Sequence, residues 1–182
     1  MPHAPKSKEF PLILLKTIFS FMICDGKMSP DELKYLRTYA SKDQMFKDID
    51  VEQELDDMVD LVNLKGVDFL QDYFKKVNHI NLTEDQEITM LDCAMEMIQS
   101  DNKIKQDEIN FLRILRTELK TSDDKILEKF PDIALHFVQK DDLTAAYIKE
   151  IYDNYFHERE LPQFDFMDVK DISDSFDFGK SK

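Results

Sequence analysis

Hydrophobic residues recur along this chain at the three- and four-residue spacing of amphipathic helices. Such spacing puts the apolar side chains on one face of a helix, where they can pack into a core. The scarcity of Gly and Pro disfavours turn-rich β structure. The pattern predicts an all-α protein, a single compact domain of about seven to eight helices. The series that mark the expected helices cover residues 9–24, 30–40, 51–62, 67–77, 84–98, 109–119, 122–127 and 148–155.

Two of the expected helices begin with a capping box, in which a side chain and a backbone group three residues apart bond reciprocally. Ser29 and Glu32 have this spacing, with Pro30 at the first helical position, and Thr83 and Gln86 have it again. These signals predict sharp helix starts at both places.

The helix-loop-helix of residues 12–40 occurs a second time at residues 88–116, at a constant offset. The identical pairs are Leu15/Leu91, Asp25/Asp101, Lys27/Lys103, Asp31/Asp107, Glu32/Glu108, Leu36/Leu112 and Arg37/Arg113. An internal repeat of this kind predicts one duplicated structural unit. We expect the two copies to pack around an approximate two-fold axis, with the helices of residues 51–78 bridging them.

The remaining segments divide the chain further. Residues 1–8 are polar and predict a flexible N-terminus, residues 9–120 hold the repeat, and residues 121–157 predict additional helices packed on it. Residues 158–182 form an acidic tail in which aromatic residues have no helical spacing. This tail is predicted to be either disordered or laid across the domain with its aromatic side chains anchored.

Charge and composition limit the partners. The 182 residues carry a formal net charge of −14, from 38 acidic and 24 basic side chains. Such a chain repels phosphate backbones and anionic lipid surfaces, so we expect no nucleic acid, no membrane and an unidentified protein partner. The apolar run of residues 10–24 is interrupted by Lys16 and is shorter than a membrane span. Without a signal sequence, and with Cys24 and Cys93 predicted as buried reduced thiols, the expected location is cytoplasmic.

The loop of the first repeat resembles half of an EF-hand calcium loop. Asp25 falls at position 5 and Glu32 at the bidentate position 12, but Phe21 and Ile23 stand where positions 1 and 3 must supply oxygens. The sequence therefore argues against a self-contained EF-hand.

Two half-sites could instead form one site between the copies. The candidate ligands of such a site are Asp25, Asp31, Glu32, Asp101, Asp107 and Glu108. Six carboxylates suit a hard divalent cation, with calcium, magnesium, manganese and zinc left open. In the alternative interpretation the chain holds no cofactor, and the same acids only cap helices and interact favourably with helix dipoles.

The repeated loop also resembles a known family. The residues that carry the resemblance are Asp25, Gly26, Met28, Glu32 and Leu33, with Asp101, Ile104, Glu108 and Ile109 in the second copy. They are similar to the tellurite-resistance TerB family and to the N-terminal domain of the DjlA-type DnaJ-like proteins, over about residues 9–120. The second loop departs from the pattern, because Asn102 replaces Gly. The resemblance implies a compact helical domain whose acids bind a metal cation, protein–protein contacts, a role in tellurite resistance or stress response, and no enzymatic activity.

Three functions follow as hypotheses. The first is a non-enzymatic TerB-like module that binds a divalent cation between its loops or a protein partner through its acidic surface. The second is a pure interaction scaffold in which the acidic motifs are structural. The third is a metal-dependent hydrolase, which would need the carboxylates gathered around an open coordination position beside a pocket.

Overall fold

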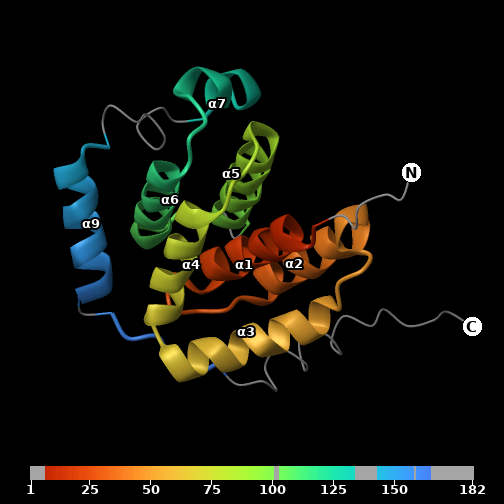
Figure 1. Cartoon of the computed structure of the whole chain (residues 1–182). Helices are drawn as coiled ribbons and strands as arrows, with labels where there is room; N and C mark the ends of the chain where they lie inside the picture. The colour runs from red at the N-terminus through yellow and green to blue at the C-terminus, as the bar shows by residue number, and fades with distance from the viewer. Residues whose placement is uncertain (1–6, 101–102, 134–142, 158, 165–182) are drawn as a thin grey trace, which may run out of the picture.

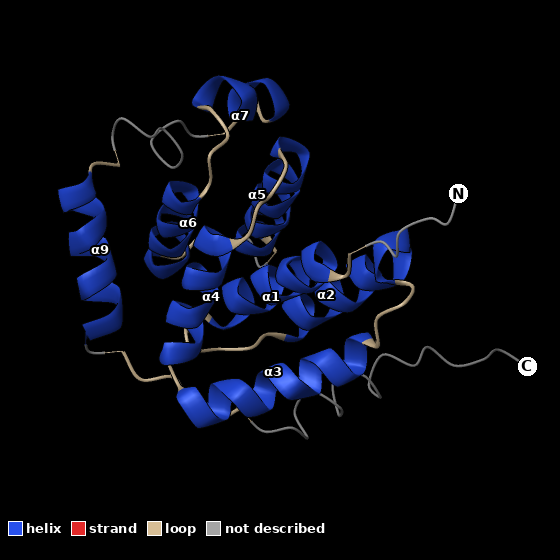
Figure 2. Ribbon diagram, viewed as in Figure 1, coloured by secondary structure: helices blue, strands red, loops and turns tan. Residues whose placement is uncertain are grey.

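The computed structural model describes residues 7–100, 103–133, 143–157 and 159–164. Over these residues the fold is all-helical and forms one compact domain without strands, as predicted (Figure 2). Eight α-helices and one short 3-10 helix occur there: α1 (Glu9–Ile23), α2 (Pro30–Lys42), η1 (Gln44–Phe46), α3 (Val51–Lys65), α4 (Asp68–His79), α5 (Glu84–Gln99), α6 (Gln106–Glu118), α7 (Asp123–Lys129) and α9 (Ala145–His157).

Both predicted capping boxes are present. The Glu32 N–H donates to Ser29 Oγ at 3.2 Å, and the Ser29 N–H donates to Glu32 Oε2 at 3.0 Å. At the start of α5 the Gln86 N–H donates to Thr83 Oγ1 at 3.3 Å, and the Thr83 N–H donates to Gln86 Oε1 at 3.0 Å. Each box satisfies two backbone donors that a helix start leaves without an intrahelical partner, which fixes where α2 and α5 begin.

The equivalent helices of the two repeats pack against each other. α1 lies against α5, and each is also followed closely by the second helix of its own repeat, α2 and α6 (Figure 1). α4 contacts both α1 and α6, so it connects the two copies, whereas α3 packs on α4 and α9 packs on α6. Within the segment that we predicted to bridge the repeats, α4 is therefore the helix that contacts both copies.

An aromatic cluster lies where four helices meet. The fully buried ring of Phe111 on α6 has its centroid 4.8 Å from that of Phe21 on α1 and 4.6 Å from that of Phe74 on α4. Tyr73 on α4 and Tyr155 on α9 contact the same ring, at 6.1 and 5.7 Å. Because α1, α4, α6 and α9 all contribute, this cluster joins both repeats to the last helix.

A buried polar network holds the turn between α6 and α7. The Glu87 carboxylate on α5 is 4% exposed and accepts from the Lys120 N–H at 2.9 Å and from the Thr121 N–H at 2.7 Å. Arg116, which is fully buried, donates to the Thr121 carbonyl at 2.8 Å and to Asp123 Oδ1 at 2.6 Å. Each buried charge therefore has several partners, as burial of a charge requires.

Two other sequence predictions can be compared with the fold. Cys24 and Cys93 are free and buried, as expected. Within the described part of the chain, no helix has both the length and the hydrophobicity needed to cross a bilayer. The predictions for the N-terminus and the acidic tail fall largely on residues 1–6 and 165–182, which lie outside the described residues.

Candidate functional site

The loop of the first repeat turns sharply at Gly26. Gly26 adopts φ 81°, in the left-handed region, and its N–H donates to the Ile23 carbonyl at 2.8 Å. Asp25 Oδ1 accepts from the Lys27 N–H at 2.9 Å, which closes a short turn. A side chain at position 26 would be strained there, so glycine ends α1 and turns the chain towards α2.

The loops of the two repeats meet through an ion pair. Lys105 Nζ, from the loop before α6, donates to Asp25 Oδ2, from the loop after α1. The Asp25 side chain is only 8% exposed. The duplicated loops therefore lie beside each other, as the repeat predicts, and the positive charge between them belongs to the chain itself.

A third segment enters the same place after α9. Arg159 Nη2 contacts Asp107 Oδ1 at 2.7 Å, and Arg159 Nη1 donates to the Cys24 carbonyl at 3.2 Å. The hydroxyl of Tyr155 donates to that carbonyl too, and the Arg159 guanidinium lies 4.3 Å from the centre of the Tyr155 ring. The carbonyl at the end of α1, which has no intrahelical donor, is thus capped by residues from the far end of the chain.

The two glutamates of the motif are buried at the third position of their helices. Glu32 is 4% and Glu108 is 2% exposed. Glu108 Oε2 accepts from the Lys105 N–H at 2.8 Å, which is the bond that Glu32 makes to Ser29 in the first copy. A lysine side chain has no acceptor, so the reciprocal bond of a capping box cannot form at Lys105.

The negative charges of four of the six predicted ligands act on one buried thiol. Burial raises the pKa of Cys24 well above its ordinary value, and the negative charges of Glu108, Asp25, Glu32 and Asp107 raise it further. These four carboxylates already have partners, because Asp25 and Asp107 contact cationic side chains and the two glutamates accept backbone N–H bonds.

The other two candidates differ. Asp31 is exposed at the start of α2, where it lines a shallow hollow that Glu96 and Gln99 of α5 also line. Asp101 lies outside the described residues. Among the residues that are described, no three His, Cys, Asp or Glu side chains converge in a way that could hold a metal ion. The cation site therefore stays a prediction.

The sequence did not reveal the basic half of this cluster. Lys105 stands where the first copy has Ser29. Lysine is unusual at a helix N-cap, and this was the one sequence signal that its side chain has another role. Arg159 and Tyr155 follow no motif, since they reach the loops only through the path of α9. The Cys24 carbonyl that both residues contact is more than a hundred residues away in the chain.

Glu32 gives the site a pH dependence. Burial raises its pKa to about 7, although hydrogen bonds from Ser29 lower it and Asp25 raises it further. At pH values between the ordinary pKa of a glutamate and the raised pKa of Glu32, the folded protein holds a proton on Glu32 that the unfolded chain has lost. Stability from this group is therefore greatest at low pH and falls as pH rises towards 7, by at most about 1.4 kcal/mol per pH unit.

The variant Glu32→Gln is expected to remove this slope. Glutamine keeps the bond to the Ser29 N–H, as Gln86 does for Thr83, but it carries no charge. Relative to wild type, the variant should gain roughly 1–3 kcal/mol of unfolding free energy between about pH 5 and about pH 8, measured by urea denaturation. Asp31→Asn, on the exposed side of the same turn, is the control. Parallel pH profiles for Glu32→Gln and wild type would contradict the expectation.

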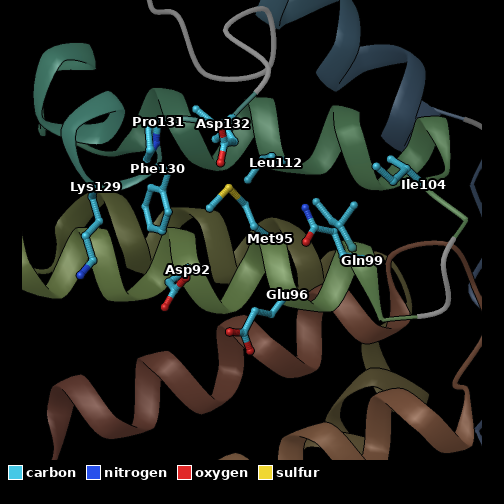
Figure 3. Close-up of a pocket in the computed structure, with 12 residues that line it drawn as sticks. Asp92, Met95, Glu96, Gln99, Ile104, Leu112, Lys129, Phe130, Pro131 and Asp132 are labelled. Atoms are coloured by element: carbon cyan, nitrogen blue, oxygen red, sulfur yellow. The ribbon is translucent and has the colours of Figure 1, made fainter.

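A second surface feature is a groove between α5 and α6. It has a volume of about 520 Å³ and is lined by Asp92, Met95, Glu96, Ile98, Gln99, Ile104, Leu112, Lys129, Phe130, Pro131, Asp132 and Ile133. Figure 3 shows Met95, Leu112 and Phe130 extending into the space between the helices, with Asp92 and Glu96 along α5.

The edge of the groove is mainly acidic. Asp92 and Glu96 lie one helical turn apart, and burial followed by the charge of Glu96 raises the pKa of Asp92 above its ordinary value. Asp132 adds a third carboxylate, and among the described residues that line the groove Lys129 is the one basic side chain. The groove thus combines an apolar interior with an edge that favours positive charge.

Comparison with protein-family models, with curated proteins and with solved structures found no match for this chain.

Proposed function

We propose that this chain is a non-enzymatic, TerB-like interaction module that binds a basic amphipathic segment of a partner protein in the groove between α5 and α6. The observation that carries the proposal is the combination of an apolar interior and an acidic edge in that groove. The resemblance of the loops would associate such a module with tellurite resistance or stress response.

The shape and chemistry of the groove support a helical or extended protein segment. Met95, Leu112 and Phe130 offer contact to apolar side chains, and Ile104 remains 50% exposed at one end. Grooves of this kind accept an amphipathic helix with its apolar face inward. Burial of Ile104 by a partner would remove apolar surface from water and favour binding.

The charge of the groove supports a basic partner. Like charges one turn apart destabilise a helix, and the pKa of Asp92 is already raised. A lysine or arginine placed between Asp92 and Glu96 would relieve that repulsion. The net charge of −14 would also speed the approach of a cationic partner.

The acidic loops support a scaffold more than a cation carrier. Asp25 pairs with Lys105 and Asp107 with Arg159, so side chains of the chain supply the positive charge that a cation would bring. Glu32 and Glu108 hold the starts of α2 and α6. In this proposal the loops make the groove helices rigid, and binding occurs elsewhere.

The proposal can be tested with a synthetic amphipathic peptide of leucine and lysine, followed by fluorescence anisotropy. The full chain should bind it, and Ile104→Glu should weaken binding by about 10-fold or more, because a charge replaces an apolar contact. Glu96→Lys should weaken it by roughly 2- to 5-fold, the effect of one exposed charge pair.

Two controls make the test specific. Asp60→Lys changes the net charge as Glu96→Lys does, but on the exposed face of α3, and it should bind like wild type. A leucine and glutamate peptide of the same length should not bind. Equal binding of both peptides, or binding unchanged in both groove variants, would overturn the proposal.

A further inference from the structure

Asn63 on α3 holds the backbone of a distant residue at two points. Its Oδ1 accepts from the Phe164 N–H at 2.7 Å, and its Nδ2 donates to the Phe164 carbonyl at 2.6 Å. Gln163 Nε2 also donates to the Asn63 carbonyl at 3.0 Å. A side-chain amide carries the same donor and acceptor pair as a peptide group, so Asn63 pairs with Phe164 much as a neighbouring β-strand would.

The segment that Asn63 holds is also anchored by its side chains. The Phe164 ring is only 9% exposed and belongs to the hydrophobic core. Pro162 lies against the first loop, 3.7 Å from the point where a Cβ at Gly26 would stand. In Figure 1 the chain runs from the end of α9 to the C-terminal end of α3, where Asn63 lies.

This arrangement has the chemistry of a peptide-recognition site. Backbone hydrogen bonds hold any extended segment, and a pocket for one side chain selects which segment fits.

The sequence contains two segments that match such a site. Phe164-Asp165-Phe166 occurs again as Phe176-Asp177-Phe178. In an extended chain, residues two apart point to the same side, about 7 Å from each other. Either segment therefore offers one phenylalanine ring for the pocket that Phe164 fills, with a second ring on the same side of the extended chain.

We propose that Asn63 and the pocket that holds the Phe164 ring form a recognition site for an extended Phe-Asp-Phe segment, and that residues 176–178 of the same chain exchange with Phe164 in it. Phe164 is seated there, and residues 165–175 can span about 35 Å when extended. A tethered second copy competes at high effective concentration. This site uses α3 and not the groove between α5 and α6, so it stands independently of the function proposed above.

The test uses a fluorescent synthetic peptide of residues 172–182 as the probe and full-length variants as receptors. The triple variant Phe164→Ala/Phe176→Ala/Phe178→Ala removes both internal competitors and should bind the probe. Wild type should bind it at least about 10-fold more weakly, because its own tail fills the site. Adding Asn63→Ala to the triple variant should reduce binding by about 10-fold or more.

A second comparison identifies the occupant. Phe164→Ala alone keeps residues 176–178 and should bind the probe more weakly than the triple variant does. Equal binding of the probe by these two proteins would overturn the exchange. Concentration-dependent dimers of Phe164→Ala would also overturn it, because they would place the tripeptide of a second copy in the site. Failure of the triple variant to bind, with its circular dichroism spectrum intact, would overturn the site itself. Phe164→Leu, which keeps an apolar anchor, replaces Phe164→Ala in all arms if the alanine variants lose helicity.

Discussion

Replacing Glu87 with alanine is expected to lower the free energy of unfolding by about 3–4 kcal/mol. The carboxylate is 4% exposed and accepts from the Lys120 N–H, the Thr121 N–H and the Thr121 hydroxyl. Alanine leaves these donors without their acceptor, and the two that belong to Thr121 are buried. It also removes a negative charge that lies close to the buried Arg116, because both side chains bond to Thr121.

Urea denaturation at neutral pH measures this loss. Glu84→Ala is the matched control, since Glu84 lies one turn earlier on α5 and is about half exposed, with only a 3.9 Å contact to Lys125. It should change the free energy of unfolding by no more than about 0.5 kcal/mol. If Glu87→Ala and Glu84→Ala unfold at the same urea concentration, Glu87 does not hold the α6–α7 turn.

Replacing Phe111 with alanine is expected to cost about 3–5 kcal/mol of unfolding free energy. The ring is fully buried and contacts Phe21 and Phe74 at centroid distances of 4.8 and 4.6 Å. Its removal leaves a cavity at the meeting point of α1, α4, α6 and α9, where several large rings would have to move together to close it.

Phe111→Leu should lose only about 1–2 kcal/mol, because most of the volume remains. Ile104→Ala, at a half-exposed position just before α6, serves as the control and should stay within about 1 kcal/mol of wild type. Thermal unfolding followed by circular dichroism gives the order of the variants. A Phe111→Ala protein as stable as Ile104→Ala would show that the ring does not join the four helices.

The helices could be predicted because their signals are local. The boxes at Ser29 and Thr83 and the apolar spacing along α1 and α5 act within a few residues, and the structure confirms them. The repeat added one long-range prediction, that the two loops belong together. The contact between Asp25 and Lys105 agrees with it.

The partners of the site could not be predicted in the same way. Glu87 and Arg116 are charged residues on helices, and their sequence neighbours give no sign that both are buried. Arg159 bonds to the Cys24 carbonyl 135 residues away and Asn63 to Phe164 101 residues away, so only the path of the folded chain brings them into contact. Six carboxylates suggested a cation, whereas the positive charge beside Asp25 comes from a lysine that no ligand motif includes.

The carbonyl at the end of α1 also bears on how the protein is made. Cys24 O receives its bonds from Tyr155 and Arg159, at sequence separations of 131 and 135 residues. A ribosome adding about 5–20 residues per second has released the first helix long before it makes these donors. We expect α1 to leave the ribosome before its last carbonyl has a hydrogen-bond donor. The packing of α9 against the end of α1 then follows synthesis of α9 and sets the slowest step of folding.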